Sequence, residues 1–193
     1  MAAKENKEKR DKRFPLFVHD NPFRRLVQRP RRFVGSYVAE GQAVADLGCG
    51  PGFYTIALAE RVGPGGKVYA ADSDEKAIRA VEKKAGQRGV GNVETHLSSA
   101  SDISFIKDGT VDFVLASGLL CSMAPRERDA AVAEIKRILK PGGRAYLSVA
   151  RGPWSYVDRA VWREILDGFR VEREGEQGFV IGDRWALVTL KNS

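Results

Sequence analysis

The sequence predicts an α/β protein whose doubly wound, seven-stranded sheet is mostly parallel, with one antiparallel strand near the C-terminus and helices on both faces. Short apolar runs with strand character alternate with segments in which apolar residues recur at helical spacing. A glycine-rich turn joins the first of these runs to the helix that follows it. Such alternation favours parallel strands joined by helical crossovers, with ligands bound beyond the carboxyl ends of the strands.

Each expected element follows from its own pattern and punctuation. Strands are expected at Ala43–Leu47, Lys67–Ala71, Val93–Leu97, Val111–Ala116, Arg144–Val149, Phe169–Arg173 and Arg184–Leu190. Helices are expected at Tyr54–Val62, Asp74–Arg88, Pro125–Leu139 and Ser155–Leu166. The third helix has the clearest apolar stripe, and the turn Pro141-Gly142-Gly143 is expected to end it. The glycine-rich residues 175–183 are expected to form a hairpin connection, which makes the last strand antiparallel.

The N-terminal 40 residues differ in composition from the rest of the chain. Residues 1–13 are almost wholly polar and are expected to be a disordered basic tail. Residues 14–40 regain apolar side chains and are expected to form a helical prelude, or lid, in which a helix begins at Pro30 and stops at Gly41. Residues 41–193 then form the main domain, because 193 residues support one substantial core rather than two.

The net charge of +7 resides in the N-terminal arm. Residues 1–32 contain eleven basic and four acidic residues, and the 21 basic and 21 acidic residues that follow cancel. Residues 4–32 could therefore steer nucleic acid or another anionic partner toward the protein. A solvated tail that only keeps the protein in solution is the alternative interpretation.

Several classes of protein do not fit this sequence. The longest apolar stretch, near Val111, falls short of the roughly 20 residues of a membrane span, and no apolar stretch follows the charged N-terminus. Cys49 and Cys121, the two cysteines, cannot form a disulfide framework or a complete zinc site by themselves. We therefore expect a cytoplasmic protein without a metal site.

The loop after the first expected strand carries the main functional signal. It reads Asp46-Leu-Gly48-Cys-Gly50-Pro-Gly52. Glycines let the backbone turn tightly and approach a ligand, and the N–H groups at the start of the next helix favour a carboxylate or phosphate. Phe53 stands where a dinucleotide-binding Gly-x-Gly-x-x-Gly pattern would need its third glycine, so the spacing is instead Asp-x-Gly-x-Gly-x-Gly.

This pattern, with the apolar strand before it, resembles the first motif of class I S-adenosylmethionine (SAM)-dependent methyltransferases, which have a Rossmann-like fold. The resemblance spans about residues 36–149. It implies SAM as the cofactor and S-adenosylhomocysteine as the product, with the glycines beneath the methionine part and Asp46 supporting the loop or the cofactor's amino group. The cofactor-binding residues expected from the resemblance and the loop are Asp46, Gly48, Cys49, Gly50, Gly52, Phe53, Tyr54, Thr55, Asp72, Ser73, Ser99, Ala100 and Ser117.

Two further positions fit this resemblance to different degrees. Asp72 ends the second expected strand, twenty positions after Gly52, where a carboxylate can accept two hydrogen bonds from a ribose diol. In the third region, many relatives have an aspartate that holds the adenine amino group, whereas this chain has Ser99. The Ser99 hydroxyl and the Ala100 backbone are therefore expected to contact adenine, with Asp102 as the alternative.

The expected pocket for the methyl acceptor is indicated by the apolar character of its residues rather than by a sequence motif. Ser117 is followed by the apolar residues Leu119, Leu120 and Met123, which together with Trp154 favour a small, partly apolar acceptor. The roof of this pocket is expected from the prelude and from the loop near Trp154, or from a second subunit in a homodimer. Because the methyl group of a sulfonium is already activated, the sequence need not contain a catalytic base.

His19 is the candidate base, because its segment could close over the cleft, and a capping or surface role is its alternative. A methyltransferase acting on a small molecule is thus the main prediction. An RNA or protein methyltransferase docked through the basic arm is a second hypothesis. A nucleotide-binding module, or an NAD-dependent oxidoreductase, is a third.

Overall fold

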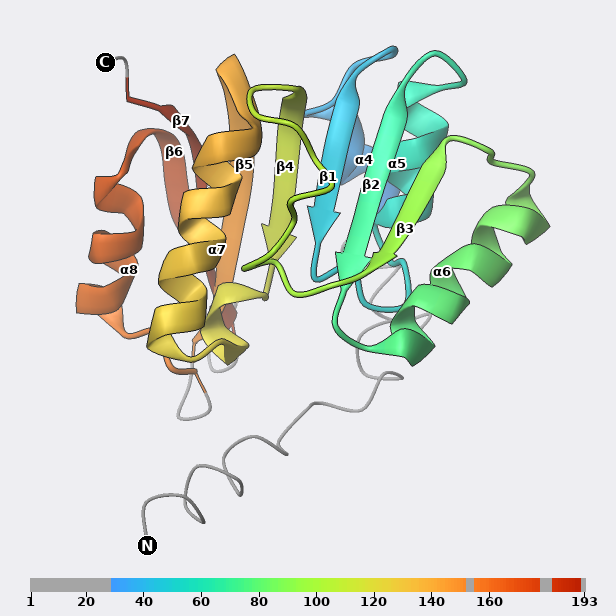
Figure 1. Ribbon diagram of the computed structural model, residues 1–193. Coiled ribbons are helices and arrows are strands. Elements are labelled where there is room, and N and C mark those ends of the chain that lie inside the picture. Colours follow the sequence, from blue (N-terminus) through green and yellow to red (C-terminus); the bar gives the residue numbers. More distant parts are fainter. Residues whose placement is uncertain (1–28, 152–154, 178–181, 192–193) are drawn as a thin grey trace, which may run out of the picture.

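The computed structural model describes residues 29–151, 155–177 and 182–191, which form a seven-stranded sheet flanked by helices (Figure 1). The strands are β1 Ala43–Leu47, β2 Lys67–Asp72, β3 Val93–Leu97, β4 Val111–Ser117, β5 Leu139–Arg151, β6 Phe169–Gln177 and β7 Gly182–Leu190. The helices are α4 Pro30–Gly35, α5 Thr55–Val62, α6 Glu75–Arg88, α7 Pro125–Ile138 and α8 Arg159–Asp167, with a 3-10 turn η1 at Leu120–Ser122. All seven predicted strands and all four predicted crossover helices are present.

The order of strands in the sheet is β3-β2-β1-β4-β5-β7-β6. The pairs among β1 to β5 are parallel, and β7 runs antiparallel to both of its neighbours, β5 and β6. This confirms the predicted, mostly parallel sheet with one antiparallel strand. The chain winds outward from β1 to β3 and then returns to β4 on the other side of β1, which creates a topological switch point between β1 and β4.

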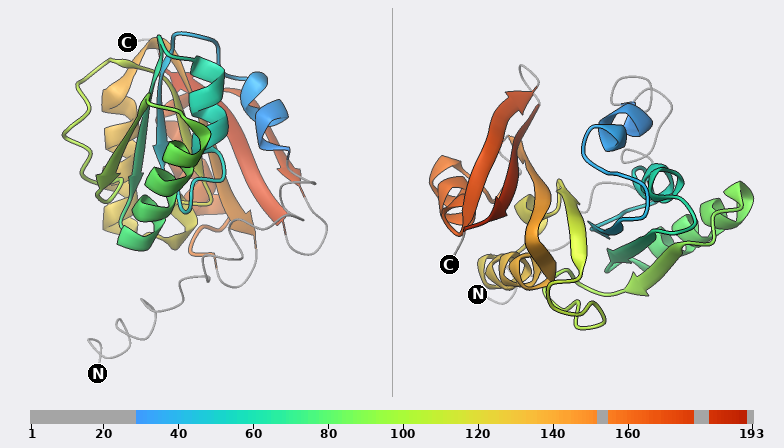
Figure 2. Two further views of the ribbon diagram at one scale, coloured as in Figure 1. Left: turned by 90° about the vertical axis from the view of Figure 1, so that its right-hand side faces the viewer. Right: turned by 90° about the horizontal axis from the view of Figure 1, so that it is seen from above.

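Helices cover both faces of the sheet, as Figure 2 shows. Successive residues of β4 point to opposite faces, as the period of a strand requires. Phe113 and Leu115 belong to the apolar cluster under α4 and α5, whereas Val114 and Ala116 belong to the cluster under α7 and α8. The second cluster is the larger of the two and forms the main core.

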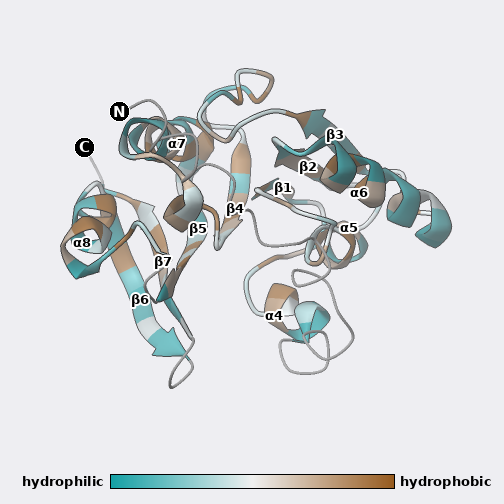
Figure 3. Cartoon of the chain, turned by 90° about the horizontal axis from the view of Figure 1, so that it is seen from below, coloured by the Kyte–Doolittle hydropathy of each residue, from teal (hydrophilic) through white to brown (hydrophobic). Residues whose placement is uncertain are grey.

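Two elements at the margin of the sheet are largely hydrophilic, and both are teal over much of their length in Figure 3. Helix α6 buries only Ala77, Ile78 and Val81, and Asp74 caps its first turn by accepting a hydrogen bond from the Lys76 N–H. Strand β6 is one of the two edge strands, and most of its residues are exposed and several are charged. Charged side chains on an edge strand discourage pairing with another chain.

Several predicted boundaries differ from the structure. Helix α8 begins at Arg159 rather than at Ser155, and β6 continues to Gln177, so residues 175–177 of the expected hairpin connection are part of a strand.

Helix α7 ends at Ile138, and the turn Pro141-Gly142-Gly143 lies inside β5, where the pairing with β4 shifts register. Leu139 is already extended, with φ −67° and ψ 133°. Pro141 also disfavours helical conformation at Lys140 and has no N–H to continue the helix, so the helix does not extend past this point. The helix that begins at Pro30 ends at Gly35 rather than at Gly41, since glycine is a poor helix former.

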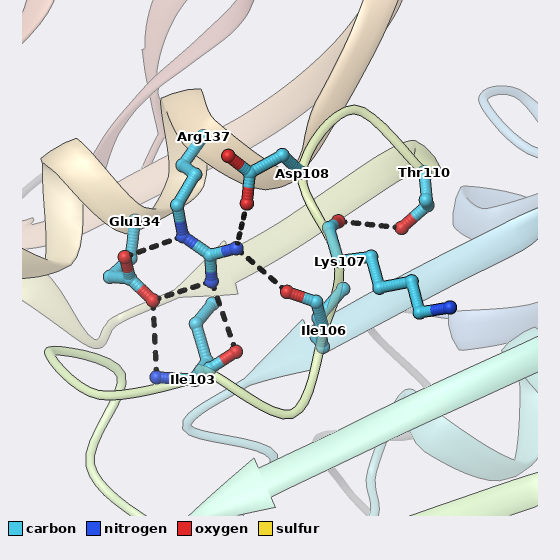
Figure 4. A network of polar contacts seen from close by, with 7 residues as sticks. All are labelled: Ile103, Ile106, Lys107, Asp108, Thr110, Glu134 and Arg137. Atoms are coloured by element: carbon cyan, nitrogen blue, oxygen red, sulfur yellow. Dashed lines mark hydrogen bonds and ion pairs between the residues drawn. The ribbon is translucent and has the colours of Figure 1, made fainter.

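The connection between β3 and β4, residues 98–110, contains neither helix nor strand and is fixed to α7 by Arg137 (Figure 4). The guanidinium donates to Glu134 at 2.7 Å, to Asp108 at 2.6 Å, and to the carbonyls of Ile106 at 2.7 Å and Ile103 at 3.1 Å. Glu134 also accepts from the Ile103 N–H, and the Arg137 guanidinium lowers the pKa of the Glu134 carboxyl. The Arg137 side chain thus ties residues 103–108 of the connection to α7.

Candidate functional site

The predicted site residues follow the ends of four neighbouring strands. Because β1, β2, β3 and β4 are parallel, their carboxyl ends meet at one edge of the sheet, where their arrowheads lie in Figure 1. The glycine loop, residues 48–54, follows β1; Asp72 ends β2; Ser99 and Ala100 follow β3; and Ser117 ends β4. The fold therefore brings the predicted residues to the same edge, at the switch point of the sheet.

The glycine loop requires its glycines for backbone conformation. Gly48, Gly50 and Gly52 have φ values of +67°, +51° and +81°, a left-handed region that other residues rarely adopt. A Cβ atom added to Gly48 would lie 2.8 Å from Leu119 Cδ1, so the loop also packs closely against the segment after β4. Gly50 has no atom within 4 Å of such a Cβ, so the loop is open at this point.

Asp72 ties the end of β2 to the glycine loop. Its Oδ2 atom accepts a hydrogen bond from the Gly50 N–H at 2.8 Å, and Oδ1 accepts from the Asp74 N–H at 2.9 Å. The N–H of Gly48 also donates to the carbonyl of Ala71 at 2.8 Å. Each carboxylate oxygen has a second lone pair, so Asp72 can accept two more hydrogen bonds from a ligand.

Asp46 and Thr55 form a buried pair beneath the loop. Their side chains are 3% and 0% exposed, and the Thr55 hydroxyl donates to Asp46 Oδ2 at 2.7 Å. Burial raises the pKa of Asp46 to about 7, the Thr55 hydrogen bond opposes this, and the charge of Asp72 adds to it. Asp46 thus holds the first residue of α5 and titrates near neutral pH.

Aromatic contacts join the glycine loop to α4. The rings of Phe53 and Tyr54 meet edge to face at 4.8 Å between centroids, and Tyr54 lies 5.0 Å from Phe33 of α4. Phe33 in turn packs edge to face on Tyr146 of β5 at 4.8 Å. Helix α4 is therefore in contact with both the glycine loop and the sheet.

The residues after β3 form a short hydrogen-bonded turn. The hydroxyls of Ser99 and Ser101 lie 2.8 Å apart, and the Asp102 N–H donates to the Ser99 carbonyl at 3.0 Å. Ala100 is buried, whereas the Asp102 side chain is exposed. Ser99, rather than Asp102, is thus the more enclosed of the two adenine candidates.

Ser148 was not singled out from the sequence, yet it fixes the end of β4. It is 2% exposed, and its hydroxyl donates to Ser117 Oγ at 3.3 Å and accepts from the Gly118 N–H at 3.2 Å. The Gly118 N–H also lies 3.0 Å from the Ser148 carbonyl. The sequence feature that could have indicated this role is a serine that stands between apolar residues in an expected strand.

The segment after β4 is apolar. Leu120, Cys121 and Met123 are buried, and Leu119 is half-buried against Gly48. The Tyr156 N–H donates to the Cys121 carbonyl at 3.2 Å, which joins this segment to the chain that follows β5. Burial raises the pKa of the thiols of Cys49 and Cys121, so both are protonated and neither is an activated nucleophile.

Comparison with known proteins decides the family. Residues 44–143 match the family model described as a methyltransferase domain. This chain belongs to the family of class I SAM-dependent methyltransferases. A crystal structure of a SAM-dependent methyltransferase from Aquifex aeolicus matches 92% of this methyltransferase and 100% of that chain, with a TM-score of 0.74 and 29% identity.

Two curated relatives each match just over half of this chain. Nocamycin O-methyltransferase of Saccharothrix syringae is 38% identical over 108 residues, 56% of this chain and 38% of that protein. Demethylmenaquinone methyltransferase of Geobacillus sp. (strain WCH70) is 35% identical over 107 residues, 55% of this chain and 44% of that protein. The chain thus spans less than half the length of these relatives.

Some predicted features of the methyltransferase lie elsewhere or outside the described residues. His19, Trp154 and residues 1–28 are outside them. A shallow cavity of about 700 Å³ lies at the opposite edge, near Lys67 and Asn92, and none of the predicted site residues line it. In residues 29–151, 155–177 and 182–191, no metal-binding group of three His, Cys, Asp or Glu is present. None of the helices within these ranges has the length and apolar character that crossing a membrane requires.

Proposed function

We propose that this methyltransferase binds SAM at the edge formed by the glycine loop and Asp72, and transfers its methyl group to a small, partly apolar acceptor. The observation that carries the proposal is the pair Asp72 and Gly50: the carboxylate is fixed against an open glycine and keeps lone pairs for a ligand. The proposed cofactor contacts are Asp46, Gly48, Cys49, Gly50, Gly52, Phe53, Tyr54, Thr55, Asp72, Ser73, Ser99, Ala100 and Ser117.

Each part of SAM has a proposed partner of matching chemistry. The ribose hydroxyls donate to Asp72, and the ammonium group lies toward Asp46, which carries charge above its pKa of about 7. Ser99 and the Ala100 backbone contact the adenine. When bound, SAM supplies an activated methyl group, and the protein's task is to hold the acceptor in line and exclude water.

The acceptor is proposed from the apolar segment after β4. Leu119 is half-buried and Met123 is buried, both close to the end of β4. The two curated relatives are named for the small molecules nocamycin and demethylmenaquinone. We infer that residues 14–40 contribute a lid over this pocket, because Phe33 of α4 contacts Tyr54 of the glycine loop. His19, within residues 14–40, stays the candidate base.

The basic arm favours one alternative function. Its surplus of positive charge suits an RNA or acidic protein acceptor. In that case methyl transfer falls steeply with salt, whereas transfer to an uncharged small molecule does not. The cytoplasmic location, the homodimer and the binding of nucleic acid through residues 4–32 stay predictions.

The proposal is tested in two steps with the full chain. Thermal unfolding is first measured with SAM, S-adenosylhomocysteine and NAD, and the first two are expected to raise the melting temperature. Stabilisation by NAD alone would overturn the proposal. Methyl-labelled SAM is then incubated with the protein and fractionated lysate. Label in small molecules is expected, and label confined to RNA or protein would support the alternative.

A further inference from the structure

Arg128 is a buried cation on α7. Its side chain is 5% exposed, and its Nε and Nη1 atoms are buried without a hydrogen-bond partner. In the described part of the chain, no salt bridge or hydrogen bond of this guanidinium is found. Leaving a buried charge without an acceptor costs free energy that packing alone does not offset, so the position calls for an explanation.

The helix places this guanidinium at the cofactor edge of the sheet. Helix α7 begins after β4 ends and finishes where β5 begins, so its first turn lies at the carboxyl edge. Arg128 lies on the buried face of α7, one turn before Ala131 and Val132. Side chains of a helix tilt toward its N-terminus, so the guanidinium extends toward the segment that contains Met123.

The first turn of α7 adds a second attraction for negative charge. The cap residue is Ala124, which has no side chain that can accept a hydrogen bond, and Pro125 occupies the first turn. The Arg128 N–H is the first in the helix to donate to a carbonyl, that of Ala124 at 2.9 Å. The N–H groups of Arg126 and Glu127 have no partner within the helix, and the helix dipole is positive at this end.

We propose that the Arg128 guanidinium and the free N–H groups of the α7 first turn bind an anionic group of the acceptor, a carboxylate or a phosphate. The planar guanidinium matches either group in a bidentate manner. The apolar part of the acceptor then lies against Leu119 and Met123. This inference rests on the proposed function, because it assigns the acceptor of the same site an acidic group.

The test measures anion binding with S-adenosylhomocysteine already bound. Benzoate and phenyl phosphate are titrated by calorimetry into the full chain, with benzamide as the neutral match. The wild type is expected to bind at least one anion more than tenfold tighter than benzamide. Arg128→Met is expected to lose this preference, Arg128→Lys to keep part of it, and Arg163→Met, which alters an exposed arginine of α8, to leave it unchanged.

The same experiment distinguishes two anionic groups that the Arg128 guanidinium could bind: the acidic group of the acceptor and the carboxylate of the cofactor. If Arg128→Met weakens S-adenosylhomocysteine instead of the added anions, the guanidinium serves the cofactor's carboxylate and the inference is overturned. Equal binding of benzamide and both anions by the wild type also overturns it. Failure of S-adenosylhomocysteine to bind the wild type would be a failure of the proposed function, which is a different result.

A stability measurement provides an independent readout. Without ligands, Arg128→Met is expected to melt at a higher temperature than the wild type, because it removes a buried charge without a partner and keeps an apolar chain of similar length. A lower melting temperature would mean that the guanidinium has a partner within the protein, and would overturn the inference.

Discussion

The Asp72 carboxylate accepts a hydrogen bond from the Gly50 N–H at 2.8 Å, across 22 positions of sequence. This bond joins the end of β2 to the loop that follows β1, and Asp72 also accepts from the Asp74 N–H at the start of α6. One carboxylate therefore sets the relative position of two strand ends and a helix, and it lies where the ribose of SAM is proposed to bind.

Replacing Asp72 by Asn is expected to weaken SAM binding about tenfold to hundredfold, since hydrogen bonds to a charged group contribute about 1.5–3 kcal/mol. The asparagine NH2 group would also face the backbone N–H groups that now donate to Asp72, so that two donors would meet. Calorimetric titration of SAM measures the effect. Glu164→Gln, which alters an exposed carboxylate of α8, serves as the control and is expected to bind like the wild type.

Alanine at Gly48 is expected to destabilise the protein more than alanine at Gly50. Both positions have positive φ, which costs about 1–2 kcal/mol for a residue with a Cβ. Only the Gly48 variant adds a contact, 2.8 Å from Leu119 Cδ1. Urea unfolding measures the difference, and the double variant Gly48→Ala, Leu119→Ala should lose less than the two single losses combined. Equal losses for Gly48→Ala and Gly50→Ala would contradict this.

Asp46 is expected to make stability fall as pH rises. Its pKa is about 7 in the folded protein, against an ordinary value of 3.8 in the unfolded chain, so the folded state binds the proton more tightly. Between these values the unfolded chain holds fewer protons, and stability decreases with rising pH, then levels above pH 7. The loss attributable to Asp46 reaches at most about 4 kcal/mol.

Urea unfolding at pH 4, 5.5 and 7 on the wild type and on Asp46→Asn would measure this dependence. The asparagine keeps an acceptor for the Thr55 hydroxyl but does not titrate. The difference in stability between the two proteins should therefore change with pH. Parallel pH profiles for the two would show that Asp46 keeps an ordinary pKa.

Arg137→Lys is expected to destabilise the protein nearly as much as Arg137→Ala. The guanidinium of Arg137 contacts two carboxylates and two carbonyls at once, a geometry that a lysine ammonium cannot reproduce. We expect a loss of about 1–3 kcal/mol in either variant. Faster amide hydrogen exchange in residues 101–110 should accompany it. Rescue by lysine would mean that charge alone, rather than the forked geometry, holds the connection.

Local patterns predicted most of the fold. Every predicted strand and crossover helix is present, because apolar periodicity and the residues at element ends specify them directly. The end of α7 was missed for a physical reason. A glycine pair often ends a helix, but here Leu139 already pairs with Val111 of β4 and Pro141 disfavours helical conformation at Lys140, so the glycines lie inside the strand.

The site could be predicted only where its residues form a recognisable pattern within one segment of the sequence. The glycine loop and Asp72 have distinctive residues at strand ends. By contrast, the role of Ser148 arises from the pairing of β4 with β5, and the burial of Arg128 depends on how α7 packs. Neither relationship has a pattern along the chain, since contacts between distant segments decide both.

The hydrogen bonds of the glycine loop have a consequence for the kinetics of SAM binding. The loop is held by Ala71 and Asp72 through bonds internal to the protein. Its conformational entropy is therefore lost during folding rather than on encounter with the ligand. A preorganised loop of this kind allows SAM to associate without a slow ordering step. Differences in affinity between variants of this loop are then expected in the dissociation rate constant rather than in the association rate constant.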